Sequence, residues 1–183
     1  LVAKNNEVIF HKAYGYHTYD SVQSVGLNDI YDLASVTKIL GPLPAIMKLV
    51  DEKKLNLDAP FSTYWKPWRK RKDKKDLTLR QILSHQAGLT PYIIFLSKVM
   101  KNGELKGKFI KASSNKKFQK QVYPSIYIKN SFRRKMHRII NRSKVSDDKT
   151  YKYSGLTFLI FPELISQLTQ TDYETYLQEQ FYG

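Results

Sequence analysis

The residues most suited to chemistry are Ser35 and Lys38, which lie three positions apart in the segment DLASVTKIL. Residues at this spacing share a face of a helix, so the Lys38 ammonium can approach the Ser35 hydroxyl. Partial burial near a helix N-terminus disfavours the charged form of a lysine, and a neutral amine can accept the serine proton. The pair therefore predicts a serine nucleophile that is activated without histidine.

The Ser-x-x-Lys pattern must be weighed by its surroundings, because it starts at four serines: Ser35, Ser113, Ser114 and Ser146. The last three serines lie in polar, charged stretches, where lysines are solvated and serines form turns. Only Ser35 opens a run with helical spacing of apolar residues, which continues to residue 53. This run contains two prolines, each able to cost about 3 kcal/mol inside a helix. We therefore expect a kink, or two abutting pieces, after Gly41.

Other short elements must position this pair. Residues 1 to 16 predict two antiparallel strands around an Asn5-Asn6 turn, since asparagine tolerates the positive φ that tight hairpin turns need. Thr78 and Gln81 predict a capping box for a short helix that ends near Gly88, where a left-handed residue is suitable. We expect His85, in the same stretch, to make a structural hydrogen bond rather than to act in catalysis.

The second half of the chain has a different pattern. Residues 98 to 129 are polar and weakly patterned, which indicates a long excursion rather than a core element. Ser131 is predicted to cap an amphipathic basic helix over FRRKMHRII. Residues 156 to 168 predict an apolar helix interrupted by Pro162, and Thr171 with Glu174 predict a second capping box.

Positive charge is concentrated rather than spread over the chain. The formal net charge is +15, and residues 98 to 144 alone contain 15 Lys and Arg but a single acid, Glu104. A second cluster at residues 66 to 76 has seven basic residues and two acids. Such segments can attract anionic substrates by field focusing, although a solvated charge run without a partner is at least as common.

Composition excludes several classes of protein. The chain has 183 residues and 42% hydrophobic content, enough for a folded domain with its own core. There is no cysteine, so no disulfide framework or thiolate metal site can form, and the four histidines are scattered. We predict no metal site and no cofactor. The apolar stretches are too short or too interrupted to cross a bilayer.

Four segments, in order and spacing, carry a family resemblance: ASVTK, AIMKLVDEKKLNLDAP, LTLRQILSHQAGL and YKYSGLTF. They resemble the serine β-lactamase and penicillin-binding-protein superfamily, and most closely its class C-like branch of esterases, carboxypeptidases and β-lactamases. Within that branch the chain resembles the serine-hydrolase domains of Bacteroides-group bacteria, which are sometimes fused to a glycoside hydrolase. The resemblance covers essentially the whole chain. It implies an α/β (α+β) fold, in which helices flank an antiparallel sheet and a helical subdomain adjoins it.

The resemblance also implies roles for individual residues. Ser35 would be the acylated nucleophile and Lys38 its proton acceptor, while Tyr153 would relay protons between nucleophile, leaving group and water. The backbone N–H of Ser35 would supply half of an oxyanion hole. Ser154 and Gly155 would lie at the substrate. Residues 1 to 183 would form the N-terminal and helical part of one domain, with residues 98 to 145 as a basic insert in the helical subdomain.

The chain departs from the family pattern in two places. Relatives usually carry Asn or Asp where this chain has Gly155, and glycine has no side chain with which to hold the lysine or the substrate. The third motif, Lys or His followed by Ser or Thr and then Gly, does not occur before Gly183. A two-stranded hairpin alone is a poor core. We therefore expect downstream sequence or a second chain to complete the sheet.

Three functions remain open at this point. The first is a serine hydrolase that forms an acyl-enzyme with an ester, β-lactam or D-amino-acid peptide. Its substrate would be a small molecule or a cell-wall component, of anionic character if the basic segment contributes, and its location would be periplasmic, cell-envelope or extracellular. The second is a catalytically degenerate binding domain of the same fold. The third, ranked last because the basic segment falls between family motifs, is a nucleic-acid or membrane-binding module, so we expect no nucleic-acid partner.

Overall fold

The N-terminal hairpin forms where the sequence predicts it. In the computed structural model, which describes residues 1–183, β1 (Val2–Lys4) pairs antiparallel with β2 (Glu7–Phe10). Asn5 and Asn6 make the turn with φ values of 52° and 64°, so both occupy the left-handed region that the sequence analysis assigned to them. The register joins Lys4 to Glu7.

The structure divides into two compact units, Leu1–Thr37 and Lys38–Gly183. In the first unit every strand residue is exposed, including Val8, Ile9 and Phe10. A polar contact orders the chain beyond the hairpin, because the Asp29 carboxylate lies 2.7 Å from His17 Nε2 and also accepts from the Gly26 N–H. The first unit therefore has secondary structure but no buried core of its own.

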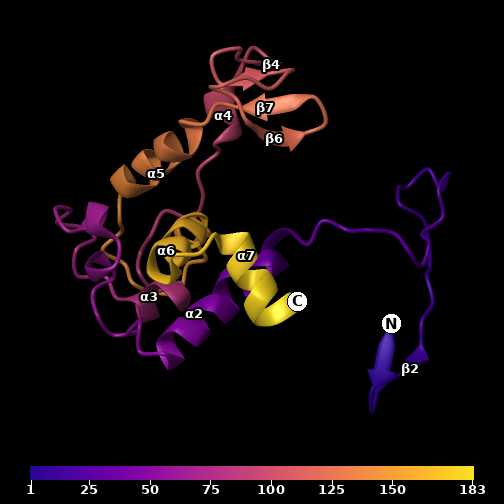
Figure 1. Cartoon of the computed structure of the whole chain (residues 1–183), viewed down its shortest axis with the longest axis horizontal. Coiled ribbons are helices and arrows are strands. Elements are labelled where there is room, and N and C mark those ends of the chain that lie inside the picture. Colours follow the sequence, from indigo (N-terminus) through magenta and orange to yellow (C-terminus); the bar gives the residue numbers. More distant parts are fainter. The chain divides into compact units, whose positions relative to one another are not determined.

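Helices are the main regular elements of the second unit (Figure 1). The longer ones are α2 (Pro42–Asp51), α3 (Leu79–Leu83), α5 (Phe132–Arg142), α6 (Phe161–Thr169) and α7 (Tyr173–Leu177). Shorter turns are η2 (Phe61–Thr63), η3 (Lys66–Trp68), α4 (Leu96–Val99) and η4 (Thr157–Leu159), and the π-helical η5 (Gln178–Tyr182) follows α7.

The predicted break in the first helical run is confirmed. The helix α1 (Thr37–Leu40) stops at Gly41, whose φ and ψ of −103° and −89° are not helical, and α2 begins at Pro42. Proline suits the first turn of a helix, since its missing N–H would have no intrahelical partner there. The prolines thus restart the helix rather than disrupt it.

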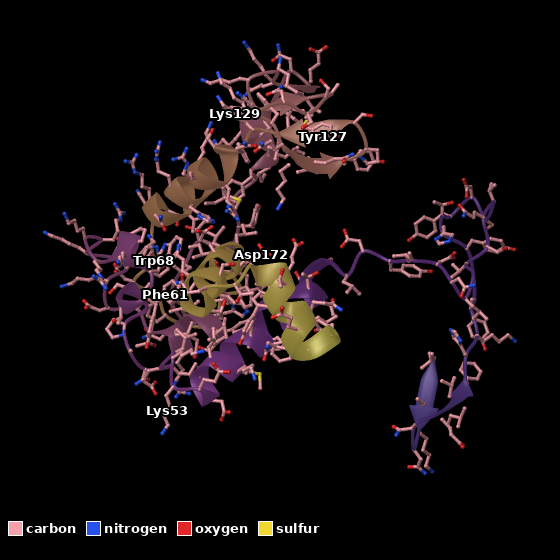
Figure 2. All side chains as sticks on the ribbon, in the orientation of Figure 1. Lys53, Phe61, Trp68, Tyr127, Lys129 and Asp172 are labelled. Atoms are coloured by element: carbon pink, nitrogen blue, oxygen red, sulfur yellow. The ribbon has the colours of Figure 1, made fainter.

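The core of the second unit forms where α2 and α6 pack together and α3 joins them. Its fully or nearly fully buried side chains include Ala45, Ile46, Leu49, Leu79, Ile82, Phe161, Leu164 and Ile165. Aromatic rings from the intervening segment extend it, because Phe61 makes edge-on contacts with Trp68 at 5.1 Å and with Phe161 at 6.0 Å between ring centroids. Figure 2 labels Phe61 and Trp68 within this helical body.

Residues 98 to 129 form short strands rather than an unstructured excursion. β3 (Met100–Lys101) pairs with β4 (Glu104–Leu105), and β5 (Ile110–Lys111), β7 (Ile126–Ile128) and β6 (Lys120–Tyr123) form a three-stranded sheet in that order. None of these strands contains a fully buried residue. Val99 and Phe118 of this region are buried, but no residue of the region belongs to the core of the second unit, as expected. The strands are too short to give a periodic signal.

The predicted helix ends are partly correct. The Thr78–Gln81 capping box is present, but α3 ends at Leu83, and His85, not Gly88, takes the left-handed conformation after it, with φ of 58°. Gly88 also has a positive φ, 68°, and in addition a Cβ at this position would strike the Ser146 carbonyl oxygen. Only glycine tolerates both this φ and this close approach.

The remaining caps differ from the sequence expectation. Ser131 occupies the N-cap position of α5, but its side chain makes no capping hydrogen bond. At α7 the N-cap is Asp172 rather than Thr171, because the extended Asp172 backbone lets its carboxylate accept from the N–H groups of Glu174 and Thr175. Pro162 lies in the first turn of α6 and so does not interrupt it.

The architecture as a whole is mixed, with helices and small antiparallel sheets, as predicted. No helix combines the length and the apolar character needed to cross a membrane.

Candidate active site

Ser35 lies in the first unit, in the short turn η1 (Ala34–Val36). The preceding residue, Ala34, has a φ of 43°, which is strained for a residue with a Cβ. A hydrogen bond holds this conformation, because the Ala34 N–H donates to Asp32 Oδ1 at 2.7 Å. Ser35 is exposed. Strained backbone of this kind is found at functional sites, where the surrounding structure maintains it.

Lys38 belongs to the second unit and is half-buried. Its Nζ lies 5.4 Å from the centre of the Tyr153 ring and 5.8 Å from the centre of the Phe158 ring, both within the range of cation–π attraction. Folding therefore brings Lys38 beside a residue that is more than 100 positions away in sequence. The predicted sharing of a helix face by Ser35 and Lys38 stays a prediction.

Gly155 also lies against Lys38. A Cβ built at Gly155 would be 3.4 Å from Lys38 Cε and 3.8 Å from Nζ, which is ordinary van der Waals contact. The backbone there does not require positive φ. An Asn or Asp side chain at this position would thus sit beside the lysine, as the family pattern implies, and glycine leaves that space unfilled.

The Tyr153-Ser154-Gly155 segment is tied to residues 85–91 by three hydrogen bonds from the segment itself. The Ser154 N–H donates to His85 Nδ1 at 3.3 Å, the Ser154 hydroxyl donates to the Thr90 carbonyl at 2.7 Å, and the Gly155 N–H donates to the Pro91 carbonyl at 3.3 Å. Just before the segment, the Lys152 N–H donates to the His85 carbonyl. These bonds fix the backbone that carries Tyr153.

Ser154 is 5% exposed. Its hydroxyl donates a hydrogen bond to the Thr90 carbonyl, and this bond holds the segment in place. The assignment of Ser154 and Gly155 to substrate binding stays a prediction.

His85 makes the structural hydrogen bond that the sequence analysis expected, and it also contacts the candidate site. Its ring lies 4.6 Å from the Tyr153 ring and 6.1 Å from the Phe158 ring, centre to centre. Burial and the nearby Lys38 charge lower the pKa of His85, against the opposing effect of the Ser154 N–H bond. Since Nδ1 accepts that bond, the neutral ring carries its proton on Nε2. The place of His85 in the sequence did not indicate that its ring contacts Tyr153. The only signal was that the stretch SHQAGL belongs to one of the four ordered motifs.

The Ser-x-x-Lys copy at Ser146 lacks this setting. The Lys149 ammonium donates to the backbone carbonyls of Ala87 and Ser146, at 3.1 Å and 2.8 Å, while the Ser146 hydroxyl accepts from the Asp148 N–H. Here the lysine joins two backbone segments through hydrogen bonds. The structure contains no group of three or more His, Asp or Glu side chains that could hold a metal ion.

Comparison with known proteins supports the ordered motifs. The family model described as Beta-lactamase matches residues 1–183, the whole chain. The chain belongs to the beta-lactamase family. Among curated relatives of the family, the protein named Protein flp from Staphylococcus aureus (strain NCTC 8325 / PS 47) is 31% identical over 91 residues, which are 49% of this chain and 18% of that protein.

Two solved structures show the beta-lactamase-family fold at low identity. The octameric penicillin-binding protein homologue from Pyrococcus abyssi has a TM-score of 0.61 and 19% identity, over 97% of this chain and 36% of that one. The D-amino acid amidase from Ochrobactrum anthropi SV3 has a TM-score of 0.59 and 15% identity, over 92% of this chain and 41% of that one. The chain thus spans less than half the length of these relatives.

Proposed function

We propose that this chain carries the nucleophile half of a serine hydrolase that forms an acyl-enzyme with an ester, a β-lactam or a D-amino-acid peptide, in the cell envelope. The observation that supports it best is the grouping of Lys38, Tyr153 and the Gly155 backbone from distant parts of the sequence. Membership in the beta-lactamase family supports the reaction class. The relatives named as a penicillin-binding protein homologue and a D-amino acid amidase support the substrate classes.

In the proposed reaction the Ser35 hydroxyl oxygen attacks the carbonyl carbon of the substrate. Lys38 takes the hydroxyl proton, and Tyr153 passes a proton to the leaving group as the bond to that group breaks. The Ser35 N–H stabilises the oxyanion that forms on the carbonyl oxygen. Water then attacks the acyl-enzyme, Lys38 and Tyr153 move its proton back to Ser35, and the acid is released.

The setting of His85 supports this assignment of roles. A neutral His85 adds no positive charge beside Lys38, and its Nδ1 fixes the backbone next to Tyr153. His85 is therefore a positioning residue in the proposal, not a proton carrier.

Covalent labelling of Ser35 tests the proposal. The natural protein that contains these 183 residues is incubated with a fluorophosphonate and, separately, with a β-lactam, and the mass of the intact protein is measured. We expect one adduct, located on Ser35 by peptide mapping and lost in Ser35→Ala. Ser146→Ala is the matched control, because it alters a second Ser-x-x-Lys copy, and it should label fully. No adduct, or one that survives Ser35→Ala, would contradict the proposal.

A second candidate, a degenerate binding domain, is favoured by one observation, the unfilled space between Gly155 and Lys38. Gly155→Asn separates the two candidates, because the backbone accepts a side chain there. If the wild-type protein labels Ser35, the hydrolase stands. If neither wild type nor Gly155→Asn labels, while both retain the same thermal stability, the degenerate domain is the better description.

A further inference from the structure

A groove lies between α5 and the segment around η3, and none of the candidate active-site residues lines it. Its volume is about 400 Å³. Four arginines line it, Arg71 from the turn after η3 and Arg134, Arg138 and Arg142 from α5, and we call it the arginine groove. Trp65 and Pro67 form its apolar side.

The three α5 arginines form a regular row. They are spaced four residues apart, which on an α-helix places them on one side at intervals of about 6 Å along the axis. None of the three is in an ion pair with an acid, and all three are exposed. Like charges at this spacing destabilise a helix. The row is therefore a cost to the fold that an anionic ligand would offset.

Charge on the opposite wall is only partly balanced. Of the lining arginines only Arg71 pairs with a carboxylate, that of Asp73, and Asp73 is shared, since Oδ1 lies 3.3 Å from Arg71 Nε and Oδ2 lies 3.1 Å from Lys74 Nζ. Arg133, on the same helix, pairs instead with Glu163 of α6 at 3.2 Å. The charge left over in the groove is positive.

The floor of the groove is rigid. The indole N–H groups of Trp65 and Trp68 both donate to Asn141 Oδ1, at 2.8 Å and 3.0 Å, which ties α5 to the opposite wall (Figure 2 labels Trp68). The Lys74 ammonium, 0% exposed, donates to the Ser143 carbonyl at the end of α5. These two links thus hold the helix that carries the three arginines against the opposite side of the groove.

We propose that the arginine groove binds a chain of phosphodiester groups, recognised through the phosphates alone. Guanidinium groups bind phosphate oxygens in a planar, two-point geometry. An interval of about 6 Å suits successive phosphates of an extended phosphodiester chain better than the single charge of an isolated carboxylate. The row of three α5 arginines would then contact three consecutive phosphates.

The buried tryptophans argue against recognition of nucleic-acid bases. Proteins that bind single-stranded nucleic acid stack bases on accessible aromatic rings. Trp65, which lines the groove, is 5% exposed, and Trp68, which does not line it, is 0% exposed; both indole N–H groups already donate to Asn141. The groove therefore offers bases no ring on which to stack, and the occupant that it suits is a phosphodiester polymer with a sugar or polyol backbone.

Two labelled probes of equal charge test this assignment by fluorescence anisotropy on the whole chain. One is a ten-nucleotide oligothymidylate and the other is the abasic phosphodiester of the same length. We expect the two probes to bind with affinities within about threefold of each other, and the logarithm of affinity to fall with the logarithm of salt concentration at a slope of about −2, since each contact contributes roughly −0.7 for a single strand. Binding of the oligothymidylate alone would overturn recognition through phosphates, and salt-independent binding would overturn the groove as an electrostatic site.

Matched substitutions on α5 locate the site. Arg138→Ala should lower the affinity for the abasic probe about tenfold and reduce the salt slope by about 0.7, whereas Arg133→Ala, with the same change in charge on another face, should lower it less than twofold. Arg138→Lys, which keeps the charge but loses the two-point geometry of the guanidinium, should give an intermediate loss of affinity. Equal losses for Arg133→Ala and Arg138→Ala, with helix content unchanged by circular dichroism, would mean diffuse attraction and would overturn the proposal.

Discussion

The cluster around Lys38 and the arginine groove are both assembled from distant parts of the chain, yet they treat positive charge in opposite ways. Beside Lys38 lie two aromatic rings within cation–π range, and the pKa of the neighbouring His85 is lowered, so His85 adds no second charge there. In the groove, arginines line an open surface, and the one carboxylate that pairs with them, Asp73, is shared with Lys74. A cluster with a single amine suits proton transfer, while a surface that collects cations suits anion binding.

The largest effect is expected from removing the amine in the first region. Lys38→Met should lower the rate of Ser35 acylation by a fluorophosphonate about 10³-fold or more, because no other group is placed to accept the serine proton in the proposed mechanism. Lys48→Met is the matched control, since Lys48 is a half-buried lysine of α2 that pairs with Glu52, and it should acylate at the wild-type rate. If Lys38→Met keeps its rate, this cluster is not the proton-transfer site.

The next effect concerns the stability of the groove wall. Lys74→Ala should lower the free energy of unfolding by about 2–4 kcal/mol, because it removes a buried side chain and leaves the Ser143 carbonyl without its donor. Urea denaturation measures the change. Lys72→Ala, at an exposed neighbour, should stay within about 0.5 kcal/mol. A small effect at Lys74 would mean that the wall does not depend on this link.

A smaller effect should distinguish the role of the His85 side chain from that of its backbone. His85→Gly suits the positive φ but lacks the acceptor, and it should lower the acylation rate about tenfold through misplacement of Tyr153. His85→Asn tolerates the same φ and offers an oxygen near the place of Nδ1, so it should stay within about threefold of wild type. Equal rates for the two variants would show that the acceptor does not matter.

The smallest effect is the pH dependence of stability. The pKa values of His85 and His137 are lowered, in both cases chiefly by burial. Below about pH 6.5 the unfolded chain binds protons at these positions more readily than the folded chain does, so stability should fall as pH falls through this range. Thermal unfolding between about pH 7 and pH 5 should show this decline, and the double variant His85→Asn, His137→Asn should flatten it. An unchanged slope would exclude these two histidines as its cause.

Local sequence determined much of this protein. Asn5-Asn6 predicted the hairpin, Pro42 predicted the helix break, and the capping box at Thr78 was correct, because each depends on backbone preferences within a few residues. The ordered motifs at Ser35, His85 and Tyr153 indicated the family. Periodicity failed where elements were only two to four residues long, as in the strands between residues 100 and 128.

Tertiary structure alone decided the rest. Nothing local places Lys38 against Gly155, or uses the Ser154 hydroxyl and the Nδ1 atom of His85 to fix the backbone beside Tyr153. From the sequence, the α5 arginines indicate an ordinary solvated helix face. The structure shows that hydrogen bonds from Trp65, Trp68 and Lys74 hold α5 against the opposite side of a groove. Contacts between segments far apart in the chain depend on packing and burial, which only the folded structure specifies.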